Sequence, residues 1–293
     1  MSDRHLDPTV RQEFVFLFDV TDGNPNGDPD AANQPRVDPE TGHGLVTDVA
    51  LKRKIRNYIG LARPDDPACK VFVEAGVALN SHMRRAYEVL DLGSGKKKGG
   101  RKPDDVREAQ AWMCENFFDV RVFGAVMSTG DFDAGKVQGP VQLTFARSID
   151  PVVPFEHAIT RVTPTREADT KETEMGSKWT VAYGLYRCHG FFSAHLAERT
   201  GVTSEDLALL YDALGTMFDH DRSAARGQMA TRALHVFTHS SRLGNAPAHT
   251  LLEAVRVVRV GDDRPARSYA DYTISIPDQS SLPAGITLTT LTG

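Results

Sequence analysis

The chain has 293 residues, of which 40% are hydrophobic and 25% charged, and its formal net charge is −5 at pH 7. This composition is ordinary for a globular protein of one large domain or two small ones. The acidic balance argues against a nonspecific polyanion binder, but basic clusters at 52–56 (KRKIR) and 96–102 (KKKGGRK) would allow nucleic acid to bind along a defined path.

No apolar stretch approaches membrane-spanning length, and the first residues, MSDRHLDPTVRQ, contain no signal-peptide core. We therefore expect a cytoplasmic protein without a membrane partner. The three cysteines, Cys69, Cys114 and Cys188, lie far apart and form no CxxC pair. They predict buried, inert thiols and no zinc or other cofactor.

The most informative stretch is 13–63. It predicts a strand at 14–20, a long polar loop at 21–44 and then a helix. Thr47 is a good N-cap for this helix, and an acidic residue in the first turn suits its dipole. Its apolar face is formed at helical spacing by Leu51, Ile55, Tyr58 and Ile59.

The rest of the chain shows one element after another. In order, the patterns predict a helix at 71–91, a Gly/Lys-rich loop at 93–100, a helix at 103–118, strands at 119–127 and 141–146, a protruding polar arm at 156–178, a strand at 179–192, a helix at 204–218 capped by Ser204, a strand at 233–238, an ambiguous helix or strand at 251–260 and a peripheral tail from 275.

Without its insertions, the chain reads strand, helix, strands, helix, strand. This order is compatible with an α+β fold built on a ferredoxin-like core of the RNA-recognition-motif type. We expect a single domain over 1–293, with one insertion at 63–118 and another at 156–178.

Cations gather at the start of the first helix, in Lys52, Arg53 and Arg56. Together with the free N–H groups that follow Thr47, they would attract phosphates. A solvated surface helix explains the same residues equally well. The second basic cluster, which could follow a nucleic-acid backbone or simply be solvated, consists of Lys96, Lys97, Lys98, Arg101 and Lys102.

The polar arm carries further candidates. Its cations are Arg161, Arg166, Lys171 and Lys178, and Met175 either wedges between bases or folds back onto the core. After the second predicted helix, Arg222 and Arg226 follow His220, and this group could contact phosphate or cap the helix.

Candidates for catalysis are weaker. The acidic cluster Asp19, Asp22, Asp28 and Asp30 could bind Mg²⁺, but a solvated, turn-rich loop is the favoured interpretation. His235 and His239 follow a strand-like run, which favours a structural pair over a metal site. No nucleophile or kinase motif is present. The sequence therefore predicts no catalytic or metal site.

Five stretches together resemble a known family. They are FDVTDGNPNGDP…GLVTDVALKRKIRNYI, VRVFGAVMSTGDFDAGKVQGPVQLTFARSIDPV, HAITRV, FDHDRSAARG and HSSRLGNAPAH. The resemblance covers almost the whole chain. It is to the backbone subunit of type I CRISPR effector (Cascade) complexes, in particular type I-C, within the RAMP superfamily.

This resemblance implies a palm of the RNA-recognition type, a finger at 63–118 and a thumb at 156–178. It implies an antiviral ribonucleoprotein in which copies form a filament along one crRNA with other Cascade subunits. Lys52, Arg53 and Arg56 would contact guide phosphates, the thumb would kink the guide, and the open bases would pair with target DNA. Tyr183 and Tyr186 lie three apart, so at most one of them stacks on a base.

Two alternatives belong to other classes. Related filament subunits of type III complexes cut target RNA with a loop aspartate, so an endoribonuclease is the first rival. A purely structural oligomer is the second. If Lys52 and Arg53 both contact RNA phosphates, replacing them with Ala should flatten the log–log salt slope by roughly 1.4.

Overall fold

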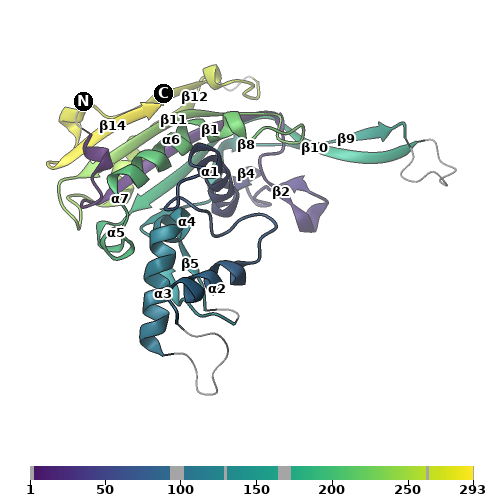
Figure 1. The fold of residues 1–293 in the computed structure, drawn as a ribbon. Coiled ribbons are helices and arrows are strands. Elements are labelled where there is room, and N and C mark those ends of the chain that lie inside the picture. Colours follow the sequence, from purple (N-terminus) through teal and green to yellow (C-terminus); the bar gives the residue numbers. More distant parts are fainter. Residues whose placement is uncertain (1–2, 93–101, 129–130, 164–172, 262–263, 293) are drawn as a thin grey trace.

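The computed structural model describes residues 3–92, 102–128, 131–163, 173–261 and 264–292. One antiparallel sheet of eight strands forms the centre of the fold (Figure 1). Its path runs through β14 (Ile286–Thr292), β11 (Gln228–His239), β1 (Gln12–Gly23), β10 (Glu174–Phe192), β8 (Ala146–Pro151) and β4 (His43–Val46), while β7 (Val141–Leu143) and β9 (Pro154–Arg161) also pair with β10.

The predicted order of strand, helix, strands, helix and strand is confirmed, except that the first half of the predicted strand at 119–127 is a helix. Helix α1 (Asp48–Ala62) comes between β1 and β8 in the chain, and α6 (Ser204–His220) comes between β10 and β11. In the sheet these four strands take the spatial order β11-β1-β10-β8, so the first strand lies between the third and the last.

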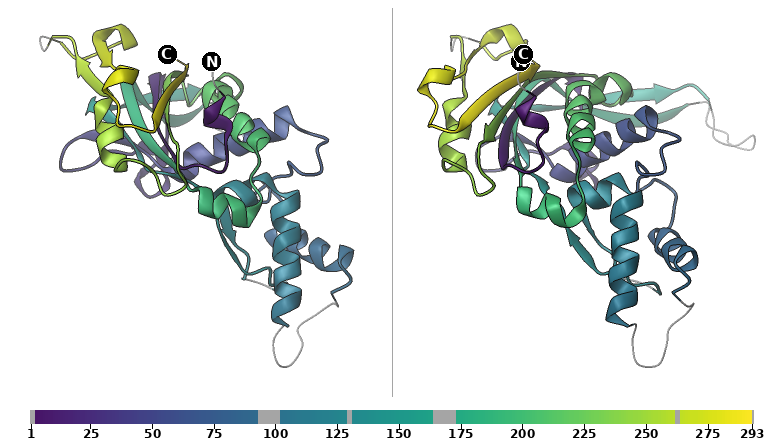
Figure 2. Two further views of the ribbon diagram at one scale, coloured as in Figure 1. Left: turned by 90° about the vertical axis from the view of Figure 1, so that its left-hand side faces the viewer. Right: turned by 60° about the vertical axis from the view of Figure 1, so that its left-hand side comes forward.

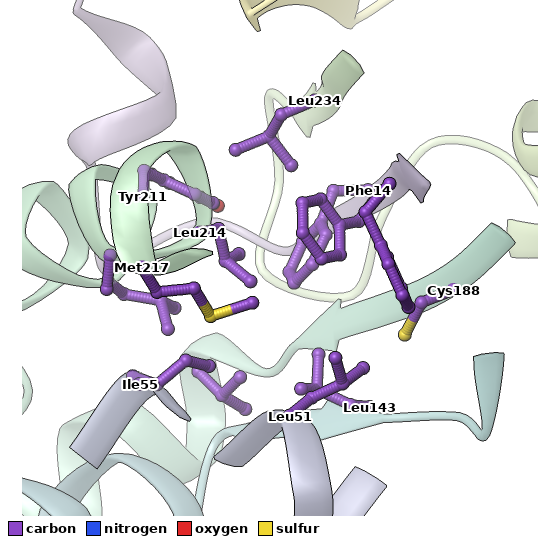
Figure 3. Packing of buried hydrophobic residues seen from close by; sticks show 14 of the residues in the cluster. Phe14, Leu51, Ile55, Leu143, Cys188, Tyr211, Leu214, Met217 and Leu234 are labelled. Carbon is purple, nitrogen blue, oxygen red and sulfur yellow. The ribbon is translucent and has the colours of Figure 1, made fainter. Parts of the chain in front are cut away.

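The central strand β1 explains how the core is divided. Its first nine residues are all buried, as expected for a strand covered on both faces. Alternate side chains enter two different hydrophobic clusters, with Phe14 on one side and Val15 on the other. Figure 3 shows Phe14 facing residues of α6 and α1, which cover the first face: Tyr211, Leu214, Met217, Leu51 and Ile55.

The second face is covered by C-terminal elements. These are α7 (Ala248–Ala254) and the hairpin of β12 (Arg256–Arg259) and β13 (Tyr272–Ser275), which resolve the ambiguous stretch into a helix followed by a strand. Tyr183 points to this face and Tyr186 to the opposite one, as their spacing predicts. Both are buried, so neither offers a platform for a base.

A helical lobe projects from the first face of the sheet (Figure 1). It contains α2 (Leu79–Val89), α3 (Pro103–Asn116), α4 (Phe118–Phe123), β5 (Gly124–Val126) and β6 (Lys136–Gln138), while α5 (Ala194–Thr200) lies beside its junction with the sheet. Its hydrophobic cluster takes residues from Phe72 to Ala134, so it extends past residue 118.

The predicted strand at 119–127 is wrong over its first half, which forms α4. The alternation in VRVF resembles a strand, but non-local contacts override it. Both carboxylate oxygens of Asp119 accept backbone N–H groups, from Phe72 at 2.7 Å and Val73 at 3.0 Å. The guanidinium of Arg121 donates to the backbone carbonyl of Cys114 at 2.7 Å.

Other boundaries also differ from the sequence prediction. The helix at 71–91 begins only at Leu79, and 141–146 is broken into β7 and the start of β8. The cap of α6 is Thr203, in a capping box with Asp206, and not Ser204. The polar loop 21–44 is partly ordered by β2 (Gly27–Asp28), β3 (Gln34–Pro35) and β4, and short 3-10 helices occur at Arg4–Leu6, Pro29–Ala31, Tyr269–Asp271 and Gln279–Ser281.

The segment predicted to protrude forms a two-stranded arm. Strand β9 pairs with β10 from Val181 outward to Glu174, while β1 pairs with β10 only from Val181 inward. The side chains of β9 are mostly exposed. The arm and the helical lobe leave the sheet in different directions (Figures 1 and 2).

Candidate nucleic-acid interface

The polar loop is tied directly to the start of α1. Thr47 is the N-cap, and its hydroxyl accepts the N–H of Ala50 at 3.2 Å. The N–H of Thr47 donates in turn to the Asn26 side-chain carbonyl at 2.9 Å. The loop is therefore held against the positive end of the helix, where an anion is stabilised.

Three segments that are distant in the sequence enclose a groove of about 370 Å³ at this helix start. We call it the helix-start groove. The chain after α6 joins it because the Asn24 N–H donates to the Ala225 carbonyl at 2.8 Å. The approach requires a glycine, since a Cβ on Gly23 would lie 1.9 Å from the Arg226 carbonyl oxygen. The groove is lined by Asn24, Pro25, Asn26, Gly27, Asn33, Ala50, Arg53, Lys54, Ser223, Ala225 and Arg226.

The cations of this groove differ in their partners. Lys54 and Arg226 both bind the Asp221 carboxylate, so one charge of the pair is neutralised. Burial lowers the pKa of Lys54, and Asp221 opposes that shift. Arg53 donates to the Val73 carbonyl at 2.7 Å and makes no ion pair with any described carboxylate. Its charge remains for a ligand.

Lys52 and Arg56 do not line the helix-start groove. Lys52 pairs with Asp48 at 2.9 Å, and Arg56 pairs with the buried Asp119 at 2.7 Å. Both cations lie 5.6 Å from the centre of the Phe123 ring. The structure thus brings Arg53 and Arg226 together but directs Lys52 and Arg56 toward the helical lobe.

The other two candidates near the end of α6, His220 and Arg222, lie at the surface. Arg222 pairs with Asp219 at 2.9 Å and is exposed, and it does not line the groove. The His220 ring lies 5.8 Å from the Tyr58 ring, so it packs beside α1.

The two faces of the arm carry different side chains. In the paired register, Lys178 lies opposite His157 and Arg161 lies opposite Glu174, which places both cations on one face. Arg161 also pairs with Glu174. Met175 lies on the other face and is 81% exposed, so it does not fold back onto the core.

Several predicted contacts lie outside the described residues. They are Lys96, Lys97, Lys98, Arg101, Arg166 and Lys171. Lys102 is described, and it is exposed directly before α3.

Asp19 and the two histidine candidates are engaged inside the fold, whereas Asp22 and Asp30 are exposed and Asp28 pairs with Arg36. Asp19 is buried and accepts from Tyr183 at 2.9 Å and Arg232 at 2.8 Å. Burial raises the Asp19 pKa, and Arg232 opposes that shift. His239 bonds to Glu13 at 2.6 Å and His235 bonds through Nδ1 to Thr290 at 2.9 Å, while the Nε2 of His235 is buried without a partner among the described residues.

The described residues were compared with what a metal site or a reactive cysteine requires. Within the ranges that the structure describes, no group of three or more His, Cys, Asp or Glu side chains could hold a metal ion. All three cysteines are free and buried, as predicted. Burial raises the pKa of Cys69 and Cys114 to about 11 and that of Cys188 to about 12, so their thiolates are scarce at neutral pH. No helix in the described chain has the length and apolar character to cross a membrane.

The asparagines of the groove were not among the residues predicted to bind a ligand. The side-chain amide of Asn24 donates to the backbone carbonyl of Asn33 at 2.7 Å, and the side chain of Asn26 accepts the N–H of the N-cap residue Thr47. Their available signal was the clustering of Asn with Gly and Pro, which is typical of loops that hydrogen-bond their own backbone.

Comparisons with known proteins identify the family of this chain. The family model described as CRISPR-associated protein Cas7 matches residues 10–277. A CRISPR-associated protein Cas7 of Haloferax volcanii is 29% identical over 217 residues, which make up 68% of this chain and 62% of the relative. The chain therefore spans less than two thirds of that relative's length.

Similar solved structures include chains of two CRISPR RNA-guided surveillance complexes, one described as pre-nicking. The pre-nicking chain has a TM-score of 0.48 at 14% identity, with 78% of each chain covered. The second has a TM-score of 0.44 at 14% identity, covering 77% of this chain and 69% of the other. A chain of a type III-B Cmr-beta complex bound to cognate target RNA has a TM-score of 0.42 at 13% identity, covering 78% and 61%. Because the family model covers most of its length, the chain belongs to the CRISPR-associated Cas7 family.

Proposed function

We propose that this protein is the guide-RNA-binding backbone subunit of a type I-C Cascade complex, in which copies assemble along one crRNA. The observation that carries the proposal is the helix-start groove. There the N-terminal turn of α1, the unpaired Arg53 and the partly exposed Arg226 line one concavity.

The groove suits a sugar–phosphate backbone better than a base. Helix N–H groups and arginines bind phosphate oxygens in any sequence, and asparagine side chains can bond to sugars. A guide-holding protein needs this kind of grip, because recognition of sequence is delegated to pairing between the guide and the target.

The remaining parts have roles in the same proposal. The strands β11-β1-β10-β8 form the palm, the helical lobe forms the finger, and the arm forms the thumb that crosses the guide on a neighbouring copy. The thumb face with Arg161 and Lys178 meets phosphates, while Met175 wedges at the kink. The cluster at 96–102 contacts the guide or the incoming target DNA, with other Cascade subunits completing a cytoplasmic assembly.

We propose a non-enzymatic role. An RNA-cleaving rival needs an aspartate beside the scissile phosphate together with a metal ion. Asp19 is buried behind Tyr183 and Arg232, and Asp28 caps a 3-10 helix and pairs with Arg36. Incubating the assembled complex with complementary RNA and Mg²⁺ tests this point, and regularly spaced products would establish the rival.

The direct test is to purify the protein from a strain that expresses a guide. A large particle that carries RNA of one discrete length is the expected result. Nuclease treatment during purification should dissociate it. A stable oligomer that forms without RNA would favour a purely structural role.

A further inference from the structure

A second groove, of about 580 Å³, lies on the other side of Arg53. One wall is the C-terminal half of α1, and the other is the chain from Arg63 to the first turns of α2. Arg53 lines both this groove and the helix-start groove. We call it the lobe-side groove.

The lobe-side groove is basic in a protein whose net charge is −5. Five cations line it against two carboxylates, Asp66 and Glu74. The cations are Arg53, Arg56, Arg63, Lys70 and Arg85. Arg56 is held by Asp119, which does not line the groove. The other four make no ion pair with a carboxylate among the described residues.

The backbone that carries Lys70 is held in place by hydrogen bonds. The N–H of Lys70 donates to the Asn116 carbonyl at 3.2 Å, and the Lys70 carbonyl accepts from Phe118 at 2.9 Å. Lys70 is therefore joined to the junction of α3 and α4. The buried Phe117 forms part of the floor. Cations that line one groove repel one another in the absence of a ligand, and a bound polyanion would relieve that repulsion.

We infer that the lobe-side groove binds the sugar–phosphate backbone of a nucleic-acid strand that continues past Arg53 from the helix-start groove. The inference rests on the proposed function, which it extends to Arg63, Lys70 and Arg85. The ligand chemistry is a chain of phosphodiesters, and either the guide or the target strand can supply it.

Gly60 provides a clean probe of this groove. It lines the groove from α1, and a Cβ added there would meet nothing within 4 Å. Gly60→Glu places a carboxylate among the cations, Gly60→Lys adds a cation, and Gly60→Gln adds bulk alone. Gly215→Glu adds the same negative charge on α6, where a Cβ would make only an ordinary contact with Thr292 at 3.7 Å.

The experiment measures the affinity of the purified protein for single-stranded RNA and DNA of one sequence by fluorescence anisotropy. Gly60→Glu should weaken binding about fivefold at about 0.1 M salt and flatten the log–log salt slope by roughly 0.7, as expected for one lost phosphate contact. Gly60→Lys should strengthen binding, while Gly60→Gln and Gly215→Glu should match the wild type. Equal results for Glu, Gln and Lys at position 60, both in this assay and in the capture of complementary DNA by the RNA-loaded assembly, would overturn the inference, as would an equal loss in Gly215→Glu.

Two further measurements show whether the guide or the target strand occupies the groove, and they separate this inference from the proposed function. If Gly60→Glu weakens RNA binding by the free protein, the guide occupies the groove. If it weakens only the capture of complementary DNA by the RNA-loaded assembly, the target strand does. Arg226→Ala reports on the helix-start groove. A loss of binding in Arg226→Ala alone leaves the proposed function standing and removes this inference. A loss in Gly60→Glu alone supports the lobe-side groove and removes the helix-start groove from the path of the strand.

Discussion

The cations near the junction of the lobe and the sheet fall into two groups, those paired with a buried carboxylate and those that line a groove without such a partner. Arg121 makes two hydrogen bonds to Asp206 at 2.7 and 2.9 Å, and Arg56 is held by the buried Asp119. Arg53 and Lys70 line grooves without a described carboxylate partner. The first group joins segments of the fold, whereas the second keeps its charge for a ligand.

The difference shows why a basic run is a weak guide to function. In KRKIR, three of the four cations are paired with carboxylates, and Arg53 has no such partner among the described residues. Lys54 is paired with Asp221 and Arg56 with Asp119, whereas Arg53, the neighbour of Lys54, has no described carboxylate partner. Carboxylates elsewhere in the chain decide which cation remains available.

The strongest test of the comparison is Arg121→Ala. This change leaves the Asp206 carboxylate buried without its cation, so we expect the free energy of unfolding to fall by about 3–5 kcal/mol. Urea denaturation measures the loss. Arg222→Ala is the control, because its exposed pair with Asp219 should contribute about 0–1 kcal/mol. Equal losses would contradict the division between buried and exposed cations.

Neighbouring residues of α1 provide the next test. Arg53→Ala should weaken RNA binding about fivefold at about 0.1 M salt and flatten the salt slope by roughly 0.7. Lys52→Ala should have a smaller effect, because Lys52 is paired with Asp48. The double variant then sets an upper limit of roughly 1.4 on the change in slope. If Lys52→Ala weakens RNA binding as much as Arg53→Ala or more, the ion pair with Asp48 does not prevent Lys52 from binding RNA.

A third kind of site gives a smaller, pH-dependent effect. Arg187 donates to His189 Nε2 at 2.8 Å, and burial together with the Arg187 charge lowers the His189 pKa from 6.5 to about 4. Between these values the unfolded chain binds the proton and the folded chain does not, so stability is full above about pH 6.5 and declines as the pH falls toward about 4.

His189→Gln keeps an acceptor for Arg187 but removes the titration. Urea midpoints measured from pH 4 to 7 should therefore vary less in this variant than in the wild type. Parallel curves would assign the acid sensitivity to other groups.

The smallest effect on stability is expected at the arm. Met175 is 81% exposed, so Met175→Ala should leave the unfolding midpoint unchanged. The reactivity of guide bases at the proposed kinks should change, because the wedge would be lost. Chemical probing of RNA in the assembled complex measures it. An unchanged pattern would remove Met175 from the site.

Elements with local signals were predictable from the sequence. Thr47 and the spacing of Leu51, Ile55 and Ile59 predicted α1, and the long apolar run at 179–192 predicted the inner part of β10. The helical lobe was less predictable. Asp119 holds backbone groups that lie 46 and 47 residues away, and nothing in the VRVF pattern reveals them.

The same distinction applies to the candidate site. The basic run and the polar loop were visible, and the structure places both at one groove. The partners that sort the cations were not visible, since Asp119 is 63 residues from Arg56 and Asp221 is 167 residues from Lys54. Arg63, Lys70 and Arg85 come together only because the helical lobe packs beside α1.

Strand β10 also limits how the arm can change in length. Residues 174–180 extend beyond the pairing with β1, a reach of about 23 Å at roughly 3.3 Å per residue. Inserting one residue in each strand of the arm would turn every side chain farther out to the opposite face. Inserting two would keep Met175 and Lys178 on their present faces and lengthen the arm by about 7 Å. Functional arms in relatives should therefore differ in length by even numbers of residues per strand.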